Sequence, residues 1–220
     1  MSMLDTCILG GEVLLPHGVA GVDLGIKDGA IAGIYAPGTA PEAHETIDAS
    51  GKTVLPGIVD IHFHVRAPAY PERGTVQSET RAAAAGGVTT IFEMPISKPC
   101  CSTPEELERR RDHFLENAVV DFALYAAPGD LTEASRDRMV ALGCIAWKIF
   151  TIEAPPGRDD EFDGLAFPEE ADQMRALELL APTGLPVVVH AESASLLRHF
   201  AAAAEALDPN VKLIAPWRIK

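Results

Sequence analysis

From Gly57 onward the sequence alternates between short apolar runs and segments with helical periodicity, and no other feature limits the possible folds as strongly. Strands that alternate with helices predict parallel βα units, in which each helix covers one side of the sheet. We therefore predict an α/β fold. The predicted strands are residues 57–65, 88–94, 119–126, 145–150 and 186–190.

The clearest predicted helix lies in the segment STPEELERRRDHFLEN. Thr103 suits the N-cap position, and Glu106, three residues later, would complete a capping box. The apolar residues Leu107, Phe114 and Leu115 then recur at roughly helical spacing. We expect all three side chains to face the sheet.

Residues 1–56 have a different pattern, with short apolar runs separated by turn-forming sequences such as GG, PHG and KDG. Such spacing predicts a small β domain, which we expect to be sandwich-like. Residues 57–220 would form the N-terminal part of a (β/α)8 TIM-type barrel. A closed barrel needs about 250 residues, so the predicted barrel is incomplete.

Composition restricts the partners and the cellular location. The chain has 32 acidic and 18 basic residues and a formal charge of -14, which disfavours binding to nucleic acid or to an anionic membrane surface. A small-molecule partner is expected instead. The four cysteines, Cys7, Cys100, Cys101 and Cys144, lack metal-finger spacing, and no apolar run reaches the roughly 18 residues of a membrane span. We expect a reduced, cytoplasmic protein.

The first candidate site lies in the segment DIHFHVR, at the end of the first predicted strand of the barrel. Side chains two residues apart on a strand project to the same face, so His62, His64 and Arg66 would point together. The histidines could bind one metal ion, and the arginine could bind an anion. The alternative is that all three are ordinary polar residues at a strand end.

Two later strands also carry polar residues. Lys148 is central in the apolar segment CIAWKIF, where burial would lower its pKa toward the neutral amine. A neutral amine can add carbon dioxide and form a carbamate that bridges two metal ions. Lys148 could instead extend its amine to solvent. His190 ends the run LPVVVH. A single histidine at a strand end is weak evidence, but three separate strands that end in His-x-His, Lys and His indicate a shared site.

In order and spacing, LPGIVDIHFHVR, RAAAAGGVTTIFEMP, AWKIF and VVVHAES resemble the cyclic amidohydrolase group of the amidohydrolase superfamily, which contains dihydroorotases, allantoinases and hydantoinases. The resemblance covers about residues 4–200. It implies a metal-dependent (β/α) barrel with a flanking β domain and two divalent ions, which we expect to be zinc. We also expect a homo-oligomer.

The resemblance also implies roles for individual residues. His62 and His64 would bind one metal ion, carboxylated Lys148 would bridge both ions, and His190 would bind the second. His62, His64 and Lys148 would therefore be catalytic residues. A metal-activated hydroxide would attack an amide carbonyl of the substrate, and the ring C–N bond would open.

The identity of the ring depends on substrate contacts. Arg66 matches the dihydroorotase pattern His-x-His-x-Arg, in which the guanidinium binds the substrate carboxylate. Ile96, however, stands where dihydroorotases have an asparagine, and Glu153 lies where hydantoinases have a tyrosine. We favour a dihydroorotase-like activity, and allantoinase or another ureide-ring hydrolase remains the alternative.

The family pattern also contains a histidine on the sixth strand and an aspartate at the end of the eighth. The segment VKLIAPW, a candidate for the start of the sixth strand, contains no histidine. The chain would then be a fragment, be completed by another chain or be degenerate. The rival hypothesis is a noncatalytic amidohydrolase-like subunit that assembles with a partner enzyme.

Overall fold

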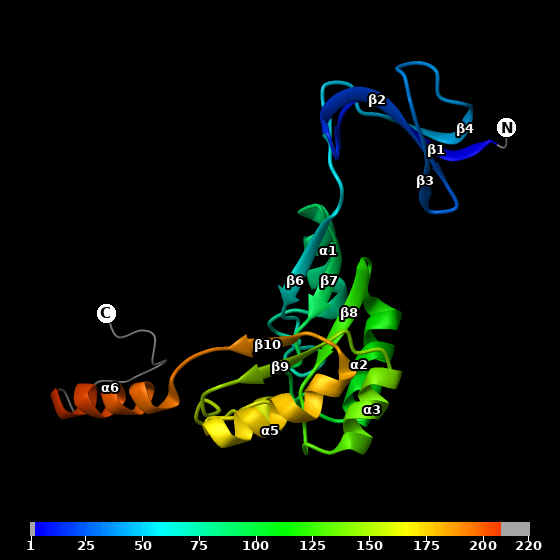
Figure 1. Ribbon diagram of the computed structural model, residues 1–220. Coiled ribbons are helices and arrows are strands. Elements are labelled where there is room, and N and C mark those ends of the chain that lie inside the picture. Colours follow the sequence, from blue (N-terminus) through cyan, green and yellow to red (C-terminus); the bar gives the residue numbers. More distant parts are fainter. Residues whose placement is uncertain (1–2, 208–220) are drawn as a thin grey trace. The chain divides into compact units, whose positions relative to one another are not determined.

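The computed structural model describes residues 3–207 and divides into two compact units, Met1–Gly57 and Ile58–Lys220 (Figure 1). The segment VKLIAPW, proposed above as a sixth strand, lies outside the described residues. Among residues 3–207, no helix is both long enough and apolar enough to cross a membrane.

The first unit is a five-stranded sheet in the order β3-β2-β1-β4, in which β5 also pairs with β1. The first three strands form antiparallel pairs, whereas β4 and β5 run parallel to β1. The described residues of this unit thus form one sheet and do not show the second sheet of a sandwich. The strands are β1 (Leu4–Leu15), β2 (Gly18–Lys27), β3 (Ala30–Tyr35), β4 (Ala43–Asp48) and β5 (Thr53–Val54).

The sequence GG, predicted to break the chain, instead lies inside β1. The register with β2 shifts between Ile8 and Gly11, and Gly10 has a φ of 71°, a left-handed conformation that glycine adopts without strain. The backbone N–H of Gly10 donates to the buried Asp23 carboxylate at 3.0 Å. A bulge therefore joins two predicted runs into one strand.

The second unit contains a parallel sheet in the order β10-β9-β8-β7-β6 (Figure 1). Each strand pairs with the next one along the chain, which is the strand order of a (β/α) barrel, here incomplete. All five predicted strands are confirmed within a few residues. They are β6 (Ile58–Phe63), β7 (Val88–Glu93), β8 (Asp121–Ala126), β9 (Ala146–Phe150) and β10 (Val187–His190).

Helices follow the strands of this sheet, and α1, α2 and α3 lie along one of its faces (Figure 1). Neighbouring helices also contact one another, as α1 does with α2 and α2 with α3. The helical elements are α1 (Val76–Ala85), α2 (Pro104–Asn117), α3 (Glu133–Ala141), the short α4 (Asp159–Phe162), α5 (Glu170–Leu180), the 3-10 turn η1 (Ala181–Thr183) and α6 (Ala194–Leu207).

Helix α2 confirms its predicted N-cap but only half of its capping box. The Thr103 hydroxyl accepts the backbone N–H of Glu106 at 3.2 Å, whereas the Glu106 carboxylate pairs with Arg109. Leu107 and Phe114 are buried, but Leu115 is 67% exposed, so its predicted packing is wrong. At about 100° per residue, Leu115 lies about 80° around the helix from Leu107.

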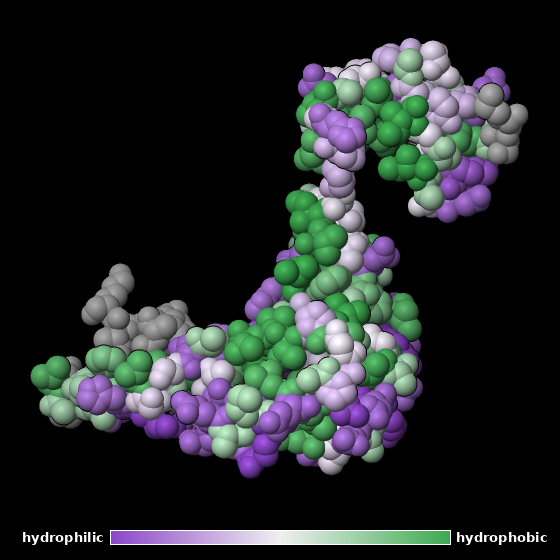
Figure 2. Space-filling view, viewed as in Figure 1, coloured by the Kyte–Doolittle hydropathy of each residue, from purple (hydrophilic) through white to green (hydrophobic). Residues whose placement is uncertain are grey.

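Burial differs between the centre and the edges of the parallel sheet. All five residues of β9 are buried, as expected for a strand covered on both faces. The expectation of a buried strand is wrong for β6, where Ile58, Val59 and Ile61 are 55%, 51% and 60% exposed. Among the described residues this strand pairs only with β7, and Figure 2 shows a hydrophobic surface over it.

Candidate functional site

The four predicted metal ligands come from three strands of the second unit. His62 is the penultimate residue of β6, His64 follows its end, Lys148 is the central residue of β9, and His190 is the last residue of β10. In a barrel of parallel strands the active site lies at the C-terminal strand ends. The rings of His62 and His64 are neighbours, with centroids 5.2 Å apart.

Phe150 links the other two predicted ligands. In the register of β9 and β10, Phe150 pairs with His190, and the two rings stack with centroids 4.4 Å apart. The Lys148 amine lies 5.0 Å from the centroid of the same phenyl ring. Lys148 and His190 thus share one aromatic neighbour, which places both side chains on the same face of two adjacent strands.

Electrostatics also connect these residues. The pKa of His64 is lowered to about 4, first by desolvation and then by the charges of His62, Arg66 and Lys148. The pKa of His62 is lowered by desolvation first and then by Lys148, with a smaller effect from His190. Both imidazoles therefore favour the neutral form, which is the form that binds metal ions.

Lys148 is 2% exposed, and burial lowers its pKa. No neighbouring charge contributes to this shift, because no carboxylate within the described residues is close enough to form an ion pair. A buried ammonium without a counterion is unfavourable. The environment therefore favours the neutral amine, which is the form able to react with carbon dioxide.

The chemistry of these side chains fits divalent ions, with three imidazoles and one amine that would present oxygen ligands once carboxylated. Within residues 3–207, no group of three or more histidine, cysteine, aspartate or glutamate residues is placed to hold a metal ion. His62, His64 and His190 therefore do not form such a three-residue group in this part of the chain. His190 Nε2 also contacts the Glu192 carboxylate.

Arg66 lies beyond the strand and does not share its alternation. Strand β6 ends at Phe63, and Arg66 has a φ of 59°, so the two-residue period that grouped it with the histidines stops before it. Its Nη1 atom lies 3.3 Å from Oε2 of Glu161. The guanidinium therefore already has a carboxylate partner within the protein.

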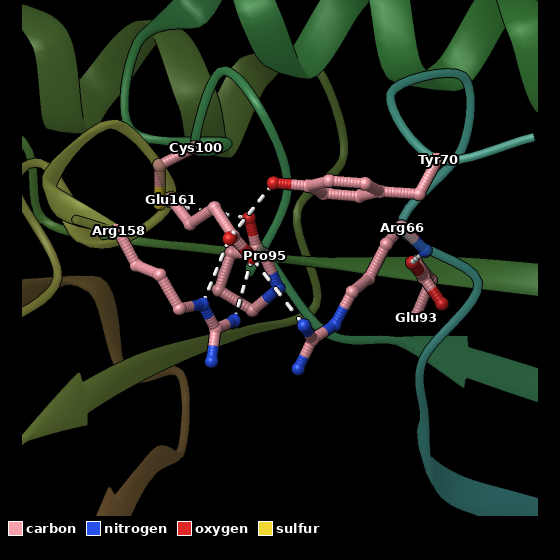
Figure 3. Close-up of polar contacts among 7 residues, drawn as sticks. All are labelled: Arg66, Tyr70, Glu93, Pro95, Cys100, Arg158 and Glu161. Carbon is pink, nitrogen blue, oxygen red and sulfur yellow. Dashed lines mark hydrogen bonds and ion pairs between the residues drawn. The ribbon is translucent and has the colours of Figure 1, made fainter. Parts of the chain in front are cut away.

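Glu161 is the centre of a network that the sequence did not predict. It lies in α4, in the connection between β9 and α5. Tyr70 donates to Oε1 at 2.9 Å, and Arg158 donates to the two carboxylate oxygens at 2.8 and 2.6 Å. These partners, Arg158 foremost, hold the pKa of Glu161 down at about 2. Figure 3 shows the network joining the loops that follow β6 and β9.

Comparisons with known proteins agree with the architecture. Residues 51–139 match the family model described as dihydro-orotase-like. The chain is 32% identical over 199 residues to the L-hydantoinase of Paenarthrobacter aurescens, covering 89% of this chain and 42% of that protein. It is 34% identical over 197 residues to the allantoinase of Solibacter usitatus, covering 87% of this chain and 40% of that protein.

Among solved structures, the L-hydantoinase (dihydropyrimidinase) from Arthrobacter aurescens matches with a TM-score of 0.83 and 29% identity. The match covers 94% of this chain and 45% of the hydantoinase chain. The chain thus spans less than half the length of these relatives.

A parallel sheet of sequential strands, preceded in the sequence by a separate β unit and matched by a hydantoinase structure, defines a TIM-barrel amidohydrolase fold of which this chain contains part. The chain belongs to the cyclic amidohydrolase group of the amidohydrolase superfamily. The family model has a dihydro-orotase-like description, whereas the relatives named above are a hydantoinase and an allantoinase. The similarity to these proteins therefore does not identify one particular ring as the substrate.

Proposed function

We propose that this protein takes part in the metal-dependent hydrolysis of the ring C–N bond of a cyclic amide. The observation that carries the proposal is the placement of His62, His64, Lys148 and His190 at the ends or centres of three parallel strands, with Phe150 contacting two of them. A noncatalytic subunit would have no physical reason to keep an unpaired amine buried at this place.

Two divalent ions, which we expect to be zinc, would be held by His62 and His64, by His190 and by a carbamate on Lys148. When bound, such ions lower the pKa of water and polarise a carbonyl group. The role of Lys148 begins before catalysis. Its neutral amine attacks the carbon of carbon dioxide and releases a proton to solvent, which leaves an anionic carbamate with two oxygen ligands.

Two classes of ring are candidate substrates. A dihydroorotase-like activity is supported by Arg66, whose guanidinium could bind a ring carboxylate. A ureide ring without a carboxylate, such as allantoin or hydantoin, is supported by the named relatives. Ile96 also favours a ureide ring without a carboxylate. It is buried in the cluster that includes Phe150 and Phe162, and it provides no polar group for a substrate contact.

Metal content tests the proposal on the chain itself. Protein purified without chelator should contain at least one zinc or other divalent ion per chain, and His62→Ala should lower this content severalfold. His113→Ala is the control, because His113 lies on α2 and contacts Asn117. A wild-type content well below one ion per chain would contradict the proposal. Assays of the complete enzyme on dihydroorotate, allantoin and hydantoin would then identify the ring.

A further inference from the structure

A buried ion pair lies next to the candidate site, and the proposed function does not use it. Glu93 is the last residue of β7, and Arg110 belongs to α2. Their side chains are 1% and 5% exposed, and Arg110 Nη1 lies 3.3 Å from Glu93 Oε1. Burying two charges is unfavourable unless further hydrogen bonds satisfy them, so the remaining partners of this pair are informative.

Those partners are backbone groups of the loop that follows His64. The N–H of Val65 donates to both oxygens of Glu93, at 3.1 and 3.0 Å, and the N–H of Arg66 donates to Oε1 at 3.3 Å. Arg110 Nη1 donates to the carbonyl oxygen of Ala67 at 2.7 Å. The ion pair therefore binds three consecutive residues of this loop.

The conformation of the loop explains why it needs this support. Arg66 has a φ of 59°, a left-handed conformation that is unfavourable for a residue other than glycine. Val65 and Ala67 are buried, so their backbone groups would lack partners without Glu93 and Arg110. Figure 3 shows the Glu93 carboxylate beside the backbone of Arg66.

We propose that Glu93 and Arg110 are positioning residues, which fix the backbone of residues 65–67 and thereby orient His64 toward the metal site. They act through the backbone and contact neither metal nor substrate. This inference rests on the proposed function, because it assigns His64 the role of a metal ligand. Groups that orient metal ligands typically change metal affinity by 10- to 100-fold when they are removed.

The test compares Arg110→Met with Arg136→Met in the full chain. Arg136 is a matched control because it is also buried and donates to a backbone carbonyl, that of Leu179, at 2.9 Å. Cobalt affinity is measured by competition with a chelator under conditions where each variant is folded. We expect Arg110→Met and Glu93→Gln to weaken binding by about 10-fold or more, and Arg136→Met to leave it within about twofold of wild type.

Arg110→Lys provides a rescue, because a lysine can still donate to the Ala67 carbonyl. It should recover part of the lost affinity. Equal cobalt affinity of Arg110→Met and Arg136→Met would overturn the proposal, since a purely structural ion pair would affect folding alone.

A second readout separates this proposal from the proposed function. If the wild-type chain binds no cobalt, the proposed metal site is wrong. The positioning role is then tested by NMR of the metal-free chain. We expect Arg110→Met, but not Arg136→Met, to accelerate amide exchange at Val65 and Arg66 and to weaken contacts between the His62 and His64 rings. Unchanged exchange and ring contacts would overturn the positioning role independently of the metal.

Discussion

At the scale of single residues, Lys148 shows how a side chain can oppose stability and still serve a site. Its strand is buried throughout, and burial lowers its pKa with no neighbouring charge to oppose the shift. The hydrophobic neighbours that stabilise β9 are therefore unfavourable for the ammonium form. The same neighbours favour the neutral amine, on which the proposed carbamate depends.

Burial of Lys148 is unfavourable for its ammonium form but favours the neutral amine, and this gives a prediction for Lys148→Met. We expect the variant to be as stable as wild type or more stable, because methionine fills the space without a buried charge. We expect its metal content to fall severalfold, because the bridging group is lost. Chemical denaturation and elemental analysis measure the two effects, with Lys98→Met as the control for an exposed lysine. A large loss of stability with unchanged metal content would assign Lys148 a structural role.

At the scale of elements, regular strands and helices could be predicted, whereas the loop between β6 and α1 could not. The five strands of the second unit were found because their apolar runs end at turn-forming residues. Arg66 was grouped with His62 and His64 by a period of two, which holds only while the chain stays extended. Its left-handed φ ends that period, and nothing in DIHFHVR indicates the change.

The partners of this loop were also missed, for a related reason. Arg66 and Glu161 are 95 residues apart in the chain, and Arg110 and Glu93 are 17 apart. Neither separation corresponds to a local motif, because each pair forms only when two different elements meet. The histidine pair and Lys148 could be proposed as site residues from the sequence because each stands out against the apolar residues of its own segment.

The Glu161 network gives a pH-dependent prediction for the attachment of α4. The pKa of the Glu161 carboxyl group is lowered from 4.5 to about 2. The stabilising effect of the ionised carboxylate is therefore fully present above about pH 4.5 and is lost as the pH falls toward 2. Glu161→Gln should therefore lower the unfolding free energy by roughly 2–3 kcal/mol at pH 7. The difference from wild type should shrink steadily between pH 4.5 and 2.

Denaturation at several pH values measures this difference. Glu116→Gln on α2 is the control, because Glu116 is exposed and should show little effect at any pH. A difference between Glu161→Gln and wild type that stays constant from pH 7 to pH 2 would mean that the ion pairs with Arg158 and Arg66 do not stabilise the fold.

At the scale of the whole molecule, the unpaired edge of β6 is the feature with the clearest consequence. Within residues 3–207 this strand pairs with β7 on one side only, and Ile58, Val59 and Ile61 are largely exposed along it. An exposed apolar edge strand offers unpaired backbone groups to another chain and favours association. We expect the 220-residue chain to self-associate through β6 as its concentration rises.

Charge placed on this edge should reduce the association. We expect Ile61→Lys to shift the chain toward the monomer by severalfold at a given concentration, because a lysine on an edge strand opposes pairing with a second edge. Leu115→Lys is the matched control, since Leu115 is a similarly exposed apolar residue on α2, away from the sheet edge. Size-exclusion chromatography with light scattering measures the effect. Equal association of both variants and wild type would show that contacts form elsewhere, and the open edge would then be no guide to how this chain assembles.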